Sequence, residues 1–180
     1  EFLPLTQADG LLSQMITGVA NAADGGVWIF HHRGMIQHWK AGVFTTLLTT
    51  GLPDVIRSGM DDGRGHLYVG HRSHGVSRID LATGHITENV EIRYLPQSTP
   101  GKDVYCLRVE PDGGIAGGSL AALSMIDREG NEWSRLEGRG LMVRYKTPLF
   151  FRVSPMEDAA ESQAPVSCMT QDSDGNIWLG

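Results

Sequence analysis

The stretch Asp172-Ser173-Asp174-Gly175-Asn176-Ile177-Trp178-Leu179-Gly180, at the end of the chain, decides the fold because its pattern recurs. It is a polar turn with a glycine, followed by a short run in which aliphatic and aromatic residues alternate. Segments of the same shape occupy residues 16–30, 56–70 and 104–118. Self-similarity of this kind is the sequence signature of repeat architectures, so we interpret the whole chain as one array.

Several columns agree when the copies are aligned without gaps. A glycine stands three positions before the aromatic column, where a tight turn demands a left-handed backbone. These glycines are Gly25, Gly65, Gly113 and Gly175, and the aromatic column holds Trp28, Tyr68, Ala116 and Trp178. The β-branched residues twelve positions earlier are Ile16, Ile56, Val104 and Val166. Because the aromatic residues recur at one repeat position, we expect them to fill the core between blades rather than to bind a sugar.

Each copy continues into two further short strands, which predicts an all-β fold of four-stranded antiparallel blades, a β-propeller. The 40 residues from Trp28 to Tyr68 match the blade period of roughly 40–45 residues. The predicted units are a leading strand at 1–9, blades at 10–48, 49–91 and 100–138, insertions at about 89–101 and 141–165, and a half blade at 166–180. Closed propellers need about four blades or more, so this partial ring of about three and a half blades predicts open edges and aggregation of an isolated segment.

Composition excludes several other classes of protein. The chain of 180 residues has 15 Lys and Arg against 21 Asp and Glu, and this net charge of −6 disfavours nucleic acid as a partner. Hydrophobic residues make up 41% of the chain, but no stretch approaches the roughly 18 apolar residues of a membrane span. Cys106 and Cys168 share one small-residue column on neighbouring inner strands, and we expect buried free thiols rather than a disulfide.

The segment 172–180 resembles the two-component regulator propeller repeat, whose pattern is roughly D-x-D-G-N-I/L-W-I/L-G. Gly51-Leu52-Pro53-Asp54 resembles the link between blades of that family, and 78–80 and 125–127 resemble a later strand of its repeat. The resemblance is weakest in the third copy, where Ala116 replaces the aromatic residue. It implies a periplasmic or extracellular sensor propeller of a bacterial receptor whose signalling output, such as a histidine kinase, lies elsewhere.

The resemblance therefore implies a non-catalytic ligand-sensing or interaction module without a cofactor. Its expected partners are further propeller blades, an output domain and a small-molecule or glycan ligand. An alternative is a propeller enzyme similar to streptogramin lyases, which carry a related repeat and need a His base, an acidic partner and a metal. No Glu stands obviously beside the histidines of this chain. A pure interaction scaffold is a third interpretation.

Two equivalent loops carry the first candidate ligand-binding residues, because both join the second and third strands of neighbouring blades. Such loops lie side by side on one face of a ring, and clustered cations there suit a carboxylate or a sulfate. The candidates are His31, His32, Arg33, His71, Arg72 and His74. Candidates of second rank are Arg57 and Tyr105, which start inner strands as Thr17 and Ser167 do. The competing interpretation is that all of these are ordinary solvated loop residues.

The aspartate-rich turns at 61–62 and 172–175 resemble calcium loops only superficially, because they lack the required ligand spacing. Aspartates that accept hydrogen bonds from the backbone of their own turn explain them better, so we predict no metal site. The insertion at 141–165 combines apolar 149–151 with acidic 157–161, which is compatible with a lid, a partner surface or a tolerated loop.

Overall fold

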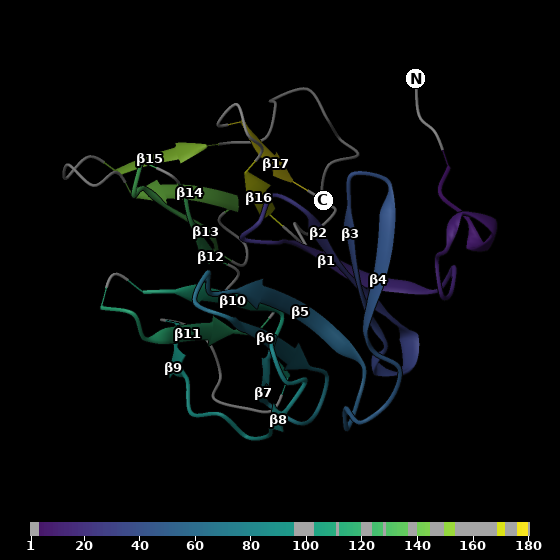
Figure 1. Cartoon of the computed structure of the whole chain (residues 1–180). Coiled ribbons are helices and arrows are strands. Elements are labelled where there is room, and N and C mark those ends of the chain that lie inside the picture. Colours follow the sequence, from purple (N-terminus) through teal and green to yellow (C-terminus); the bar gives the residue numbers. More distant parts are fainter. Residues whose placement is uncertain are drawn as a thin grey trace.

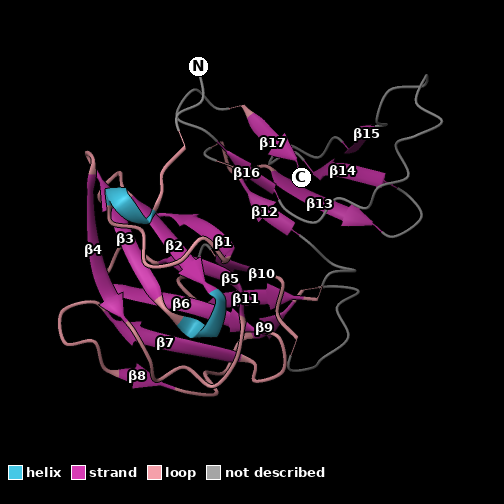
Figure 2. Cartoon of the chain, turned by 90° about the vertical axis from the view of Figure 1, so that its right-hand side faces the viewer, coloured by secondary structure: helices cyan, strands magenta, loops and turns pink. Residues whose placement is uncertain are grey.

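The structure is a computed structural model of the whole chain. The residues described are 4–95, 103–110, 112–119, 124–127, 129–136, 140–144, 150–153, 169–171 and 176–179. Strands dominate this part of the chain, and its helices are the short 3-10 turns η1 (Gln7–Asp9) and η2 (His32–Gly34). Figure 2 shows the same all-β character in colour. No helix among these residues is long and apolar enough to cross a membrane.

The first two sheets are four-stranded antiparallel blades, as predicted. One consists of β1 (Ile16–Asn21), β2 (Val27–His31), β3 (Ile36–Lys40) and β4 (Val43–Leu48). The next consists of β5 (Ile56–Asp61), β6 (His66–His71), β7 (Val76–Asp80) and β8 (Ile86–Thr87). Each strand pairs with its sequence neighbour, so each blade is a simple meander.

Three further sheets complete the described architecture. The third contains β10 (Cys106–Val109), β11 (Ile115–Gly118) and β9 (Arg93–Tyr94), the last running parallel to β11. The fourth contains β12 (Ser124–Ile126), β13 (Glu132–Leu136), β14 (Gly140–Arg144) and β15 (Phe150–Val153). The fifth pairs β16 (Met169–Gln171) with β17 (Ile177–Leu179). Figure 1 shows the five sheets arranged around a common centre, with β1, β5, β10, β12 and β16 innermost. The fold is a propeller.

The inner hairpins share one register, which confirms the aligned columns. Ala20 lies opposite Trp28, Met60 opposite Tyr68, and Thr170 opposite Trp178. Ile16 and Ile56 lie opposite His31 and His71, and in both blades a β-bulge follows directly. The bulged residues are Thr17 and Arg57, so both inner strands begin with the same local geometry.

The turns of these hairpins are built as the sequence predicts. Gly25, Gly65 and Gly113 have φ angles of 86°, 95° and 83°, a region that favours glycine. Asp24 Oδ1 accepts a hydrogen bond from the Gly26 backbone N–H at 2.9 Å, and Asp112 Oδ1 accepts one from Gly114 at 3.0 Å. In the predicted turn at 61–62, Asp61 Oδ1 accepts from the Gly63 N–H at 2.9 Å and Asp62 Oδ1 accepts from the Arg64 N–H at 2.8 Å, which confirms the turn chemistry expected there. Gly175 and the turn at 172–175 lie outside the described residues.

Aromatic residues fill the space between neighbouring blades, Trp28 between the first and second and Tyr68 between the second and third. Trp28 and Tyr68 are 7% and 8% exposed, which confirms their predicted core role, and Ala116 is buried in the same column. Trp28 Nε1 also donates to Asp61 Oδ2 of the next blade at 2.9 Å. Phe30 is fully buried, and its ring lies against Gly59 of the neighbouring inner strand. The blades are therefore held together by interlocking side chains as well as by apolar burial.

Trp178 departs from the predicted core role, because 61% of it is exposed. Its sheet has only two described strands, and none of the described residues forms a core with it. Cys106 is half-buried in β10, whereas Cys168, Val166 and Ser167 lie outside the described residues.

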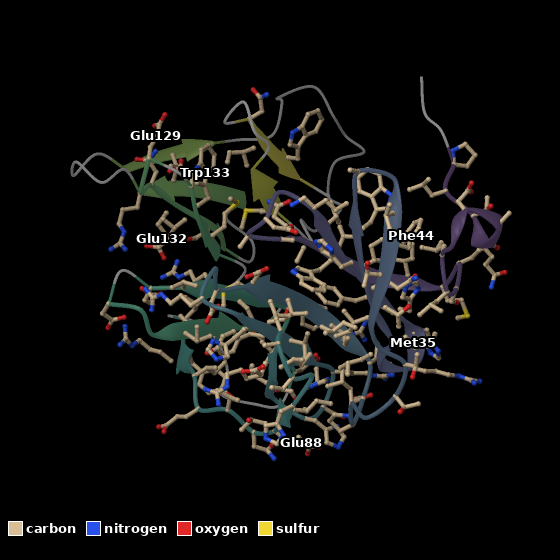
Figure 3. All side chains as sticks on the ribbon, in the orientation of Figure 1. Met35, Phe44, Glu88, Glu129, Glu132 and Trp133 are labelled. Atoms are coloured by element: carbon tan, nitrogen blue, oxygen red, sulfur yellow. The ribbon has the colours of Figure 1, made fainter. Side chains whose placement is uncertain are left out.

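The predicted leading strand at 1–9 is wrong for residues 4–9. Thr6 and Asp9 form a capping box, with Thr6 Oγ1 accepting from the Ala8 N–H and Asp9 Oδ2 accepting from the Thr6 N–H, which closes η1 instead. Gly10 ends this turn with a φ of 107° and is covered by Phe44, which Figure 3 labels beside β4.

The third predicted blade, at 100–138, is divided between two sheets. The sequence predicts 123–127 and 132–136 as its outer strands, but β12 and β13 of that region begin the fourth sheet, and β14 and β15 lie at 140–153, mostly in the region interpreted as an insertion. The turn chemistry explains the difference. Asp127 accepts from the N–H groups of Glu129 and Asn131 and from Trp133 Nε1 at 2.8 Å, with Gly130 at a φ of 87°. Met125 lies opposite Trp133, so this hairpin repeats the register of the others.

Candidate functional site

The candidate site lies on the face of the ring where the inner strands begin. We call it the link face and define it by the links 13–17, 52–57 and 103–105 and by the loops 31–35 and 71–75. Backbone hydrogen bonds tie each loop to the link of its own blade, from His32 N to Met15 O at 2.8 Å and from Arg72 N to Val55 O at 3.0 Å. The second loop also reaches the third blade, because Val104 N donates to His71 O at 2.9 Å. Loops and links therefore form one continuous surface.

His31 is fully buried beneath this face, although it was a candidate for ligand binding. Its Nδ1 lies 3.0 Å from the Ser13 carbonyl oxygen and its Nε2 lies 3.0 Å from Gln37 Oε1. Gln37 also accepts from the Leu12 N–H and donates to the Gly10 carbonyl. This network fastens the link at 10–13 to the first blade, so His31 supports the surface and does not face solvent.

His71 is the equivalent residue of the second blade and is also fully buried. Its Nε2 lies 2.8 Å from Ser77 Oγ. Burial lowers the pKa of the His71 imidazole, and the backbone and carboxylate of Asp54 oppose that shift only in part. A buried imidazole with a lowered pKa is an unfavourable partner for an anion, so His71 has a supporting role as well.

Asp54 anchors the second loop and was not among the predicted site residues. Ser73 Oγ donates to its Oδ2 at 2.5 Å, and His74 Nδ1 lies 3.5 Å from the same oxygen. The Ser73 hydrogen bond, with smaller contributions from the Val55 N–H and from His74, lowers the pKa of Asp54 to about 2. Ser73, His74 and Asp54 are not arranged as a nucleophile, base and orienting acid, because the hydroxyl donates to the carboxylate and not to the imidazole.

The exposed basic residues of the link face are the remaining loop candidates. His32, Arg33, Arg72 and His74 are exposed. Arg33 has a φ of 72°, in the left-handed region that residues with a side chain rarely adopt. Gly34 beside it packs closely on Leu52 of the next link, since a Cβ added to this glycine would lie 3.0 Å from Leu52 Cβ. The structure thus places the two basic loops on either side of the link 52–54.

Arg57 and Tyr105 come together where their two inner strands begin. They occupy equivalent positions in neighbouring blades, each directly after the buried aliphatic residue, Ile56 or Val104, at the start of the inner strand. The Arg57 Cζ lies 5.3 Å from the centre of the Tyr105 ring, a cation–π contact. Thr17 starts the first inner strand, and its hydroxyl donates to the Phe30 carbonyl at 3.3 Å.

A central cavity of about 700 Å³ lies toward the other end of the inner strands. Its lining is mainly aliphatic and includes Met60, Met125 and Met169. The charged residues that line it already have ion-pair or hydrogen-bond partners within the chain. Arg108 pairs with Glu110 at 2.7 Å and with Glu132 at 2.8 Å, and Figure 3 shows Glu132 on the fourth sheet. Asp61 accepts hydrogen bonds from Trp28 and from the Ala23 N–H. Within the described residues, no group of three or more His, Cys, Asp or Glu side chains is placed to hold a metal ion.

Comparison with known proteins supports the resemblance seen in the sequence. The family described as two component regulator propeller matches residues 161–180, which confirms that the last repeat is of this type. No curated protein matches the chain.

Solved structures of extracellular domains superpose on most of this chain. The extracellular domain of a putative hybrid two component system from B. thetaiotaomicron superposes with a TM-score of 0.61 at 22% identity, over 94% of this chain and 26% of that one. The extracellular domain of a putative one component system from the same organism gives a TM-score of 0.46 at 14% identity, over 98% of this chain and 28% of that one. The chain therefore spans about a quarter of the length of these neighbours, and at this identity the first superposition establishes the fold.

Proposed function

We propose that this propeller is a non-catalytic ligand-sensing module in the periplasmic or extracellular region of a bacterial signalling receptor. The matching repeat and the propeller fold support the receptor context, since the similar structures are extracellular domains of such systems. Further blades and an output domain are the partners that this context implies.

One observation supports the ligand-binding part of the proposal, namely that two loops with exposed basic residues are tied to the links of one face. Arg33, Arg72 and His74 lie around the link at 52–54, which its own hydrogen bonds hold in place. Arginine side chains on a rigid backbone suit an anion, because the guanidinium donates in a fixed fork. The proposed ligand class is therefore a small anionic molecule, such as an acidic glycan fragment.

Three of the four loop histidines are poorly placed for the lyase alternative, and the fourth, the exposed His32, has no acidic partner among the described residues. A His base must reach substrate, whereas His31 and His71 are fully buried. The exposed His74 is held beside Asp54 and Ser73 in a turn.

The proposal is tested by titration calorimetry of the purified receptor ectodomain with acidic and neutral glycan fragments. We expect tighter binding of the acidic fragments, and a loss of affinity of roughly tenfold or more in Arg33→Ala and in Arg72→Ala. Lys40→Ala is a matched control, because Lys40 is an exposed cation at the opposite end of its blade, paired with Asp24 at 3.1 Å. Equal affinity for both fragments, unchanged in the two arginine variants, would show that these loops are ordinary solvated turns.

A further inference from the structure

Arg57 is the extra residue of a β-bulge, which changes the direction of its side chain. The pairing of β5 with β6 skips it, since Ile56 lies opposite His71 and Ser58 lies opposite Gly70. A β-bulge of this kind turns a side chain away from the regular alternation and is common beside functional sites. The same bulge in the first blade carries Thr17, so in both blades this bulge holds a polar side chain at the start of the inner strand.

The guanidinium of Arg57 has no acceptor among the described residues. No hydrogen bond or ion pair joins it to another residue in this part of the chain, and its Nε is buried without a partner. Arg108, which is also half-buried, is matched by two carboxylates. A buried donor left unsatisfied is unfavourable, and such a group in a native fold requires an explanation.

The Tyr105 ring fixes the position of this unpaired cation. Arg57 and Tyr105 belong to different blades, and their contact at 5.3 Å spans the boundary between them. Both side chains are half-buried, so the contact is partly accessible to solvent and does not lie in the core. A guanidinium whose carbon lies over a ring makes that contact without using its N–H groups, so these stay available for two parallel hydrogen bonds to a planar anion.

We propose that Arg57 and Tyr105 form the subsite that binds a carboxylate group of the ligand. This inference rests on the proposed function and adds the position and the chemistry of recognition. The carboxylate accepts two hydrogen bonds from the Arg57 guanidinium, and Tyr105 holds the guanidinium in place. The exposed arginines of the loops then contribute longer-range attraction around this subsite.

The first test needs no ligand and compares Arg57→Met with the wild-type protein in thermal unfolding. If Arg57 serves binding, its unsatisfied N–H group destabilises the folded protein. Replacing it with an apolar side chain of similar length should therefore leave the Tm unchanged or raise it. A clear fall in the Tm of Arg57→Met would show that Arg57 is a structural residue and would overturn the inference.

The second test is calorimetry of the receptor ectodomain with a disaccharide that contains glucuronate and with its neutral glucose counterpart. We expect the acidic probe to lose roughly 10- to 100-fold in affinity in Arg57→Met, and most of that in Arg57→Lys, because an ammonium cannot donate as a planar fork. Tyr105→Phe keeps the ring and should bind as the wild type does, whereas Tyr105→Leu should bind several-fold more weakly.

The outcomes separate this inference from the proposed function. Binding of the acidic probe that is unchanged in Arg57→Met and Arg57→Lys, but lost in Arg33→Ala or Arg72→Ala, overturns the subsite and leaves the sensing module standing. Absence of binding of either probe to the wild-type ectodomain overturns both.

Discussion

The substitution Gly59→Ala tests how closely the side chains of the first two blades pack against each other. A Cβ at this position would lie 2.0 Å from Cζ, 2.3 Å from Cε2 and 3.0 Å from Cε1 of the Phe30 ring. Normal carbon contacts are about 3.5–4 Å, so the ring must move by roughly 1.5 Å. Phe30 is fully buried and packs in one cluster with Trp28, Ile36 and neighbours from both blades, which leaves it little room.

The magnitude follows from two opposing effects. Overpacking of a core side chain costs about 1–3 kcal/mol and occasionally more, and a rigid ring against backbone lies at the upper end. Replacing glycine with alanine stabilises by about 0.4–1 kcal/mol through the unfolded chain when the backbone geometry permits. We therefore expect Gly59→Ala to lower the free energy of unfolding by about 2–3 kcal/mol.

The assay is urea unfolding of the purified protein, with Gly18→Ala as the matched control. Gly18 is also an inner-strand glycine beside Phe30, but its added Cβ would lie 3.6 Å from Cδ2, an ordinary contact. Gly18→Ala should change stability by less than about 0.5 kcal/mol, and Phe30→Leu in the Gly59→Ala background should recover part of the loss. Equal effects of the two alanines would refute the interlocking of these blades at Phe30.

The remaining predictions concern polar contacts. The pKa of Asp54 is lowered to about 2, so its stabilising contribution is fully present above about pH 4 and is lost as pH falls from about 4 toward 2. Asp54→Asn should therefore lower stability at about pH 7 by on the order of 1–2 kcal/mol and flatten this acid dependence, as measured by urea unfolding at several pH values. The hydrogen bond between Trp28 Nε1 and Asp61 joins two blades. A double-mutant cycle of Trp28→Phe and Asp61→Asn should give a coupling free energy of about 1.5–3 kcal/mol, and a value near zero would contradict a stabilising role for this bond. Gln37→Leu would remove the hydrogen-bond partner of His31 and of two backbone groups in the link at 10–13. It should lower the free energy of unfolding by about 3 kcal/mol and speed amide exchange at 10–13. Unchanged exchange there would argue that Gln37 does not hold the link in place.

The repeat predicted the fold because its columns encode local geometry. Gly25 and Gly65 mark turns that need a left-handed backbone, and Trp28 and Tyr68 mark the space between blades. Both are consequences of a few neighbouring residues, so a single sequence reveals them.

The hairpin at 124–136 was harder to predict because it breaks the period. Trp133 follows Ala116 by only 17 residues, which is far less than a blade length. An alignment based on regular spacing therefore does not detect the hairpin at 124–136. The signal that could have found it is the turn itself, since Asp127, Gly130 and Trp133 stand at the offsets of the other inner hairpins.

The arrangement of the candidate site residues follows only partly from the sequence. Arg57 and Tyr105 were recognised as equivalent inner-strand residues, but only the three-dimensional arrangement shows that they contact each other. The burial of His31 and His71 depends on partners on the neighbouring strand, Gln37 and Ser77, which no pattern within the loops reveals. Adjacent histidines in one loop can therefore have opposite environments, as His31 and the exposed His32 do.

Hydrogen–deuterium exchange of the receptor ectodomain, with and without the disaccharide that contains glucuronate, tests the central claim most directly. The claim is that an anionic ligand binds on the link face, where the inner strands begin and Arg57 and Tyr105 lie. It predicts that the ligand slows exchange at 13–17, 52–57, 71–75 and 103–105. The turns at 22–26 and 61–65, at the opposite end of the inner strands, should exchange as before. Protection confined to those turns or to the lining of the central cavity would contradict the claim.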